Sequence, residues 1–202
     1  MRKITIILFS VFFILSLNTN VHAQLLKLGV GGGLTRVLGP NSYTDDIGNN
    51  GLGFSSEYNF GAIVKVGLPV IPLTPRGFFL YHKLSSNEDI TEFSQSISSL
   101  GLGLQYGFIP IPAGFDPYLS LDLTLNNFGD LTETINGNET KIGGGFSRFG
   151  LQLGIGTEVT IVPFINLDIF AGYNWFNLTG KEDGEETISA FVLDVFLMFN
   201  FL

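Results

Sequence analysis

The sequence predicts an all-β fold, namely a transmembrane up-and-down antiparallel β-barrel of eight strands preceded by a cleaved signal peptide. Three observations lead to this prediction. Apolar and polar residues alternate with a period of two, long polar connections alternate with short proline-containing ones, and glycine-rich strand faces lie opposite bulky apolar faces. The composition agrees, because 26 glycines and 20 phenylalanines accompany only 14% charged residues, which is unusual for a soluble domain.

Residues 1–23 have the layout of a secretory signal peptide. Arg2 and Lys3 form a basic start, an apolar run follows, and Ala23 supplies the small residue at the expected cleavage position. The apolar run is short for a transmembrane helix, which needs ~20 residues. We therefore expect residues 24–202 to form a single exported barrel domain.

Eight segments with period-two alternation are the predicted strands. They cover approximately residues 25–36, 54–68, 76–85, 95–108, 117–127, 146–161, 165–177 and 188–201. No extended stretch after the signal peptide combines helical spacing with capping signals, so the sequence predicts no helix there.

The connections between these strands are long and polar or short and proline-containing, in strict alternation. The long ones are residues 37–51, 86–92, 127–145 and 178–188, and the short ones are residues 69–75, 110–117 and 162–164. In an up-and-down meander all long loops lie at one end, and all short turns lie at the other end with both termini. An outer-membrane barrel has this layout, so we expect extracellular long loops and periplasmic termini.

The fifth predicted strand raises the question of which face is inside. Residues 119–127 read LSLDLTLNN, with four leucines on one face and four polar residues, Ser120, Asp122, Thr124 and Asn126, on the other. A soluble barrel would bury the leucines, whereas a membrane barrel would turn them to lipid. Eight strands enclose only a narrow interior that side chains fill, so glycine and small polar residues suit the inside. Large apolar residues suit lipid, and we expect lipid contact at Leu119, Leu121, Leu123 and Leu125.

Aromatic residues near the predicted strand ends are typical of two interfacial girdles in a membrane barrel. They are Tyr58, Phe60, Tyr81, Phe108, Tyr118, Phe128, Phe164, Tyr173 and Trp175. Ordinary core packing is the alternative interpretation of this set.

With its strand count, its alternation and the terminal strand AFVLDVFLMFNFL, the chain resembles the small eight-stranded outer-membrane barrels of Gram-negative bacteria, the OmpA-like and OmpX-type proteins. The resemblance covers residues 25–202. It implies that the barrel-assembly machinery recognises the last strand, although Phe201 is penultimate here where the family usually ends in an aromatic residue. It also implies a role in envelope integrity, adhesion or host contact.

Several charged residues fall on the predicted inward faces. We interpret six of them as a polar cluster in the lumen: Lys65, Asp122, Arg148, Glu158, Asp168 and Asp194. Glu158 and Asp168 are equidistant from Pro163 in a short turn, so they should face each other, with Lys65 and Lys27 approaching the same end. A proton or cation site is one interpretation. We favour a structural polar plug, because small barrels are normally filled inside.

The long loops and their flanks are strongly acidic. Twelve acids, Asp45, Asp46, Glu88, Asp89, Glu92, Asp130, Glu133, Glu139, Glu182, Asp183, Glu185 and Glu186, stand against the three bases Arg36, Lys141 and Lys181. Carboxylates of this kind could collect divalent cations that bridge lipopolysaccharide phosphates, while a solvated, repulsive surface is the alternative. The expected partners are therefore outer-membrane lipid and lipopolysaccharide, with possible divalent cations at the loops. The net charge of −8 and the lack of a basic stripe argue against nucleic acid.

The sequence carries no motif for a catalytic or cofactor site. The glycine clusters at residues 29–34 and 101–106 lack the third glycine of a dinucleotide-binding fingerprint, and HExxH and GxSxG are absent. His82 is the only histidine after the signal peptide, and there are no cysteines. We therefore expect no enzyme activity, no cofactor and no metal centre. Three alternatives stay open: a narrow channel for ions or small solutes, a membrane-embedded lipid-modifying enzyme, and a soluble barrel with the faces reversed.

Overall fold

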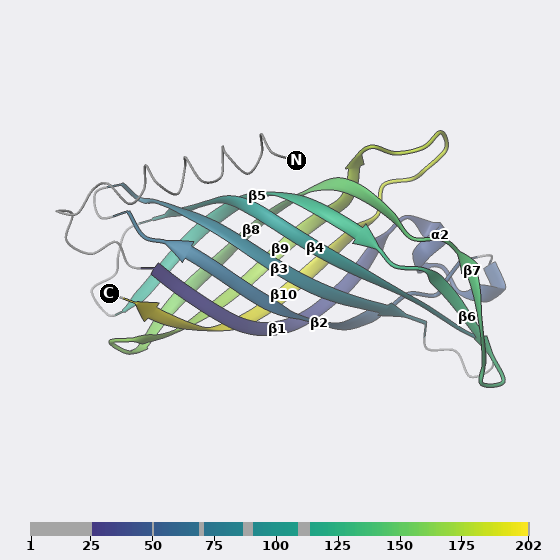
Figure 1. Ribbon diagram of the computed structural model, residues 1–202, viewed down its shortest axis with the longest axis horizontal. Coiled ribbons are helices and arrows are strands. Elements are labelled where there is room, and N and C mark those ends of the chain that lie inside the picture. Colours follow the sequence, from purple (N-terminus) through teal and green to yellow (C-terminus); the bar gives the residue numbers. More distant parts are fainter. Residues whose placement is uncertain (1–25, 50, 69–70, 87–90, 109–113, 202) are drawn as a thin grey trace, which may run out of the picture.

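The computed structural model describes residues 26–49, 51–68, 71–86, 91–108 and 114–201, and it shows a tall β-barrel (Figure 1). The wall consists of β1 (Leu26–Gly39), β2 (Ser56–Val66), β3 (Leu73–Ser85), β4 (Thr91–Gly107), β5 (Phe115–Phe128), β8 (Phe146–Val162), β9 (Ile165–Thr179) and β10 (Ser189–Phe201). Each strand pairs antiparallel with the next one along the wall, and β1 pairs with β10 to close it. The predicted eight-stranded up-and-down barrel is confirmed.

The two ends of the barrel differ in the length of their connections. We call the end with residues 40–55, 86–90, 129–145 and 180–188 the loop end, and the opposite end the turn end. At the turn end β8 and β9 are joined by residues 163–164 alone, and Leu26 pairs with Phe201. The predicted signal peptide and parts of four connections (50, 69–70, 87–90 and 109–113) lie outside the described residues.

Two features of the loop end were not predicted. The first loop contains the single helical turn α2 (Asn41–Thr44) and a 3-10 turn (Ile47–Asn49), so the prediction of no helix was wrong there. One turn is too short to show helical periodicity. Among the described residues no helix is long and apolar enough to cross a membrane.

The third long loop folds into a hairpin of β6 (Leu131–Ile135) and β7 (Asn138–Gly143), and β6 also pairs with the start of β4. Its two-residue turn is Asn136–Gly137, with φ angles of 50° and 81°. Asn-Gly is the residue pair that such tight hairpin turns favour, so the sequence did carry this signal.

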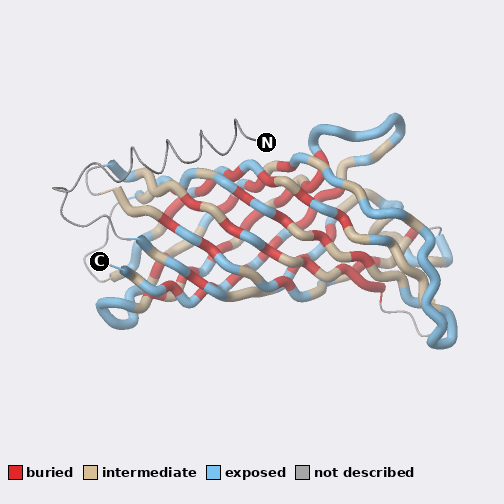
Figure 2. Tube along the Cα trace, in the orientation of Figure 1, coloured by how far each residue is buried: buried red, intermediate tan, exposed pale blue. Residues whose placement is uncertain are grey.

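Along the wall strands, exposed or half-buried residues largely alternate with buried ones, which Figure 2 shows as blue or tan segments between red ones. In β5 Leu121 and Leu123 are 53% and 69% exposed, while the side chains of Asp122 and Asn126 have no exposed surface. The faces of LSLDLTLNN are therefore as predicted. The leucines point outward and the polar residues line the interior, so a reversed, soluble barrel does not fit this structure.

Two of the nine predicted girdle aromatics are wrong. Tyr118 and Phe128 are buried inside the barrel, on the same face of β5 as Asp122. Tyr118 donates its hydroxyl hydrogen bond to Asp168, and Phe128 stacks on Phe146 at 4.4 Å between ring centroids. Ordinary core packing, the alternative considered for these residues, is the correct interpretation. Tyr58, Phe60, Phe108 and Phe164 are exposed on the outside.

Inward-facing glycines make room for the aromatic side chains of the interior. A Cβ atom at Gly154 would lie 2.3 Å from the ring of Phe170, and one at Gly156 would lie 2.4 Å from the ring of Tyr118. On β4, Gly101 lies beneath the ring of Phe78 in the same way. The glycine-rich face predicted for the interior is thus the surface against which large rings pack.

Candidate functional site

A charged cluster fills the turn end of the lumen. Glu158 and Asp168 are paired directly across β8 and β9, as the short turn between them predicted. The ammonium group of Lys65 lies 2.9 Å from a Glu158 oxygen and 2.8 Å from an Asp168 oxygen. Lys27, paired with Lys65 across β1 and β2, contacts the other Glu158 oxygen. Two cations thus neutralise two buried anions in a site where unpaired charges would be strongly destabilising.

Next to this cluster a bidentate ion pair lies on the inner face of the barrel wall. The Arg76 guanidinium donates to both oxygens of Asp122, at 2.7 and 2.6 Å, and it lies 4.7 Å from the centroid of the Phe170 ring. Arg76 is on β3 and Asp122 on β5, while Gly103 of β4 is paired with both. Because Gly103 has no side chain, nothing separates the two charged groups.

The fourth acidic residue, Asp194, belongs to a polar chain that runs toward the loop end. The Asn59 amide donates to Asp194 at 2.8 Å and to the Thr35 hydroxyl at 3.0 Å, and Thr35 is 2.8 Å from Nδ1 of His82. The His82 ring is fully buried and meets Phe176 edge-on. His82 is therefore a packed interior residue, and no other described acid or base contacts it to form a catalytic pair.

Apolar side chains fill the lumen between this row of polar residues and the loop end. Near the loop end a buried cluster is formed by Val37, Phe54, Leu84, Ile97, Phe128, Phe176, Ile188 and Ala190. At mid-height a cavity of about 10 Å³, lined in part by Arg76, Asp168 and Asp194, lies between the polar groups. That volume holds at most one water molecule.

Arg148 lies apart from the other five residues of the predicted cluster. It is at the loop end, where its guanidinium lies 2.7 Å from Glu185 and 4.6 Å from the centroid of the Phe146 ring. Alternation gives the face of a residue but not its depth, and Arg148 is the third residue of β8, at the loop-end rim of the barrel. Conversely, Arg76 was missed because it was the first residue of a predicted strand. Its spacing from Phe78 and His82 already placed it on the inward face.

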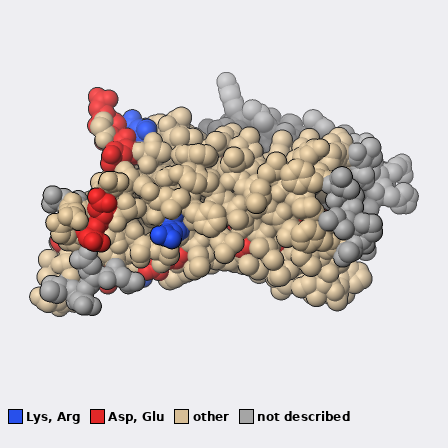
Figure 3. Space-filling view, turned by 180° about the vertical axis from the view of Figure 1, so that it is seen from behind, with Lys and Arg blue, Asp and Glu red and all other residues tan. Residues whose placement is uncertain are grey.

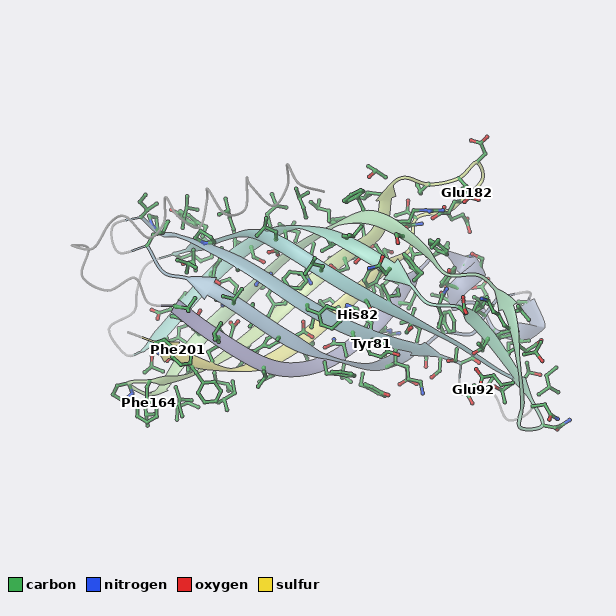
Figure 4. The ribbon with its side chains drawn as sticks, viewed as in Figure 1. Tyr81, His82, Glu92, Phe164, Glu182 and Phe201 are labelled. Carbon is green, nitrogen blue, oxygen red and sulfur yellow. The ribbon has the colours of Figure 1, made fainter. Side chains whose placement is uncertain are left out.

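A pocket of about 610 Å³ opens between the loops above Arg148. Its lining includes the aromatic rings of Tyr43 and Phe146 and four carboxylates, those of Glu182, Asp183, Glu185 and Glu186. Figure 4 shows Glu182 on the projecting loop 180–188, and its side chain is 86% exposed. Figure 3 shows acidic side chains gathered at this end of the molecule, while most of the wall on the face in view carries no charge.

The Glu185 carboxylate is held in place in the pocket by several hydrogen bonds. It accepts hydrogen bonds from Arg148, from the Asn177 amide and from the backbone N–H of Glu182. These bonds, with that from Arg148 the largest contribution, lower the pKa of Glu185 to about 2. Burial, with the Glu185 charge nearby, raises the pKa of Tyr43 to about 12. The described residues contain no group of three or more His, Asp or Glu side chains arranged to hold a metal ion.

The comparisons with known proteins agree with this architecture. The family model described as the outer membrane protein beta-barrel domain matches residues 7–201. A search of curated proteins finds no match. Neisserial surface protein A is 17% identical, with a TM-score of 0.59 over 87% of this chain and 97% of its own.

Two further solved structures have the same fold. A major outer membrane protein from Thermus thermophilus is 14% identical, with a TM-score of 0.56 over 89% of this chain and 100% of its own. Ail, the attachment invasion locus protein of Yersinia pestis, is 14% identical, with a TM-score of 0.52 over 87% of this chain and 99% of its own. At these identities the likeness concerns the fold.

Proposed function

This chain belongs to the family of outer membrane protein beta-barrel domains, and from that membership we propose that it is a non-enzymatic barrel whose role is structural and surface interaction. In this proposal the loop end faces the exterior and the turn end faces the periplasm. The barrel-assembly machinery recognises β10, and the acidic loops bind basic groups or divalent cations next to lipopolysaccharide.

The observation that supports this proposal best is the contrast between the two polar regions of the molecule. In the lumen, the charges of Lys65, Glu158, Asp168, Arg76 and Asp122 are bound to one another and buried. Groups satisfied in this way have no free capacity for a substrate or an ion. We infer that the interior is a structural plug.

The loop-end pocket offers the opposite situation. Glu182, Asp183 and Glu186 line an open hollow beside two aromatic rings, and a single cation, Arg148, lies among them. An anionic pocket with aromatic side chains in its lining favours a partner with ammonium or guanidinium groups. The partner class that fits is a basic surface segment of another protein.

Binding of model peptides tests this proposal. The barrel in lipid nanodiscs should bind decalysine and should not bind decaglutamate, and the affinity should fall with added salt. Changing Glu182→Gln, Asp183→Asn and Glu186→Gln together should weaken decalysine binding roughly tenfold or more. The matched control is Glu133→Gln with Glu139→Gln, which removes loop carboxylates outside the pocket. An equal loss of decalysine affinity in both variants would count against the pocket as the binding site. No binding of decalysine by the wild-type protein would refute the proposed partner class.

A further inference from the structure

The outer wall carries an unusual pair of cations. On the outward positions of the eight wall strands, the only described cations are Arg36 on β1 and Lys83 on β3. The one described outward carboxylate, Glu92, lies where β4 extends past the wall to pair with β6. A cation that faces hydrocarbon is strongly unfavourable, so these two residues must lie at the level of the lipid head groups.

Arg36 and Lys83 flank the same stretch of β2. Arg36 is paired with Ser56, and the ammonium group of Lys83 lies 6.0 Å from the ring centroid of Tyr58, two residues along. Their Cα atoms are therefore about two strand spacings apart, on the order of 10 Å. Both side chains are long enough to converge over this gap.

Among the described residues, neither cation has an anionic partner. Within the part of the chain that the structure describes, Arg36 and Lys83 form no ion pair, and the Tyr58 ring is the contact of Lys83. The aromatic rings of Tyr58, Phe60 and Tyr81 pack beside them, and Tyr81 lies in the half of the barrel toward the loop end (Figure 4).

Below the cations the same strands form an apolar groove of about 690 Å³. Small residues make its floor, because Ala62 and Gly77 stand on the outward face between larger neighbours such as Val30, Phe79 and Leu102. A Cβ atom at Gly77 would meet nothing closer than 3.5 Å. Along β3 the groove begins about four residues from Lys83, or roughly 13 Å toward the turn end.

We propose that this face binds a phosphorylated glycolipid of the outer leaflet. Arg36 and Lys83 hold its phosphate, the tyrosine rings cover its sugar carbons, and one acyl chain fills the groove over Ala62 and Gly77. The site extends the proposed function and rests on its orientation, with the loop end outside.

A second copy of the chain fits this face less well. Two identical subunits that packed here about a two-fold axis would bring Arg36 and Lys83 of each toward those of the other. Unpaired like charges at such an interface repel each other, whereas a lipid phosphate supplies the missing anion. The combination of cations above and an apolar groove below matches an amphipathic lipid in both charge and depth.

Native mass spectrometry of the detergent-folded barrel tests the site with three probes: bisphosphorylated lipid A, the same lipid after dephosphorylation, and phosphatidylglycerol. We expect the phosphorylated lipid A to bind at least tenfold more tightly than the dephosphorylated form. The double variant Arg36→Gln/Lys83→Gln should lose on the order of thirtyfold in affinity for phosphorylated lipid A. Gly77→Leu, which fills the groove, should weaken both forms of lipid A.

The controls separate this site from the loop-end pocket. Lys141→Gln, which removes a loop cation paired with Asp130, should leave lipid binding unchanged. The triple pocket variant should also leave it unchanged, so loss of decalysine binding with intact lipid binding would concern the proposed function alone. Gel mobility of unheated samples reports that each variant is folded. Equal binding of both lipid A forms, wild-type affinity of the double variant, or equally tight phosphatidylglycerol would each overturn the proposal.

Discussion

Arg76 and Asp122 face each other across Gly103, and the guanidinium reaches both carboxylate oxygens at 2.7 and 2.6 Å over the bare backbone of β4. A Cβ atom at Gly103 would lie 2.3 Å from one Asp122 oxygen. The pair therefore depends on three residues from three neighbouring strands. It also fixes the relative register of β3, β4 and β5 from inside the lumen.

Removing one partner of this pair should destabilise the barrel strongly. We expect Asp122→Asn to lower the free energy of unfolding by about 3 kcal/mol or more, because the Arg76 charge is left buried without an anion. The double change Arg76→Met/Asp122→Leu should recover much of that loss, since it leaves no buried charge. Denaturant titration of the vesicle-folded barrel gives both values. A double variant as unstable as the single one would contradict this interpretation of the pair.

The outer face of β5 should not tolerate charge. Leu121 is 53% exposed and points outward in a strand whose alternating residues are buried. If it lies near the bilayer midplane, Leu121→Arg should destabilise the folded barrel by about 2–4 kcal/mol. Leu121→Phe is the matched control and should have little effect, because it keeps an apolar group in lipid. A negligible loss for the arginine variant would mean that the face assignment is mistaken.

Glycine substitutions should have opposite outcomes on the two faces of the wall. Gly154→Ala places a methyl group against the Phe170 ring inside the lumen and should cost about 1–3 kcal/mol. Gly77→Ala makes the same chemical change on the outside, where the new methyl group would have only ordinary van der Waals contacts at 3.5 Å or more, and it should be neutral or slightly stabilising. Both free energies of unfolding can be compared in the same vesicles. Equal effects would show that the interior has room to relax.

The loop-end pocket should open as the pH falls. Because the pKa of Glu185 is lowered from 4.5 to about 2 in the folded loop, its stabilising contribution is complete above pH 4.5 and is lost between pH 4.5 and 2. Cleavage of loop 180–188 by pepsin should therefore become faster across that range. In Glu185→Gln cleavage should already be fast at the upper end of the range and change less with pH. Glu133→Gln, in the β6–β7 hairpin, should behave like the wild type.

Much of the fold could be predicted because apolar and polar residues alternate along each strand of a membrane barrel. The alternation in LSLDLTLNN assigned both faces of β5 correctly, and the symmetry of the turn around Pro163 brought Glu158 and Asp168 together. What alternation does not contain is the stagger between strands. The bridge from Lys65 to both carboxylates depends on that stagger. The position of Arg148 does not, because it follows directly after the predicted long loop 127–145 and was therefore already at the loop end.

The other errors arise where one sequence signal outweighs another. Aromatics near strand ends are common at the lipid interface, which favours that place for Tyr118 and Phe128, although their even spacing from Asp122 places them inside. The β6–β7 hairpin resembles a loop in sequence because its two strands are short and mostly polar, and the Asn136–Gly137 turn is the clearest signal for it. In both cases the local pattern is present in the sequence but is outweighed by a more general tendency.

The central claim is that the lumen is a filled plug and that interactions take place on the outer surfaces. Planar-bilayer recording of the reconstituted protein tests it most directly, with protease protection used to show that the barrel has inserted. We predict no discrete conductance steps for the wild type over a wide range of voltage. Reproducible single-channel steps from inserted wild-type protein would contradict the account and favour the narrow channel instead.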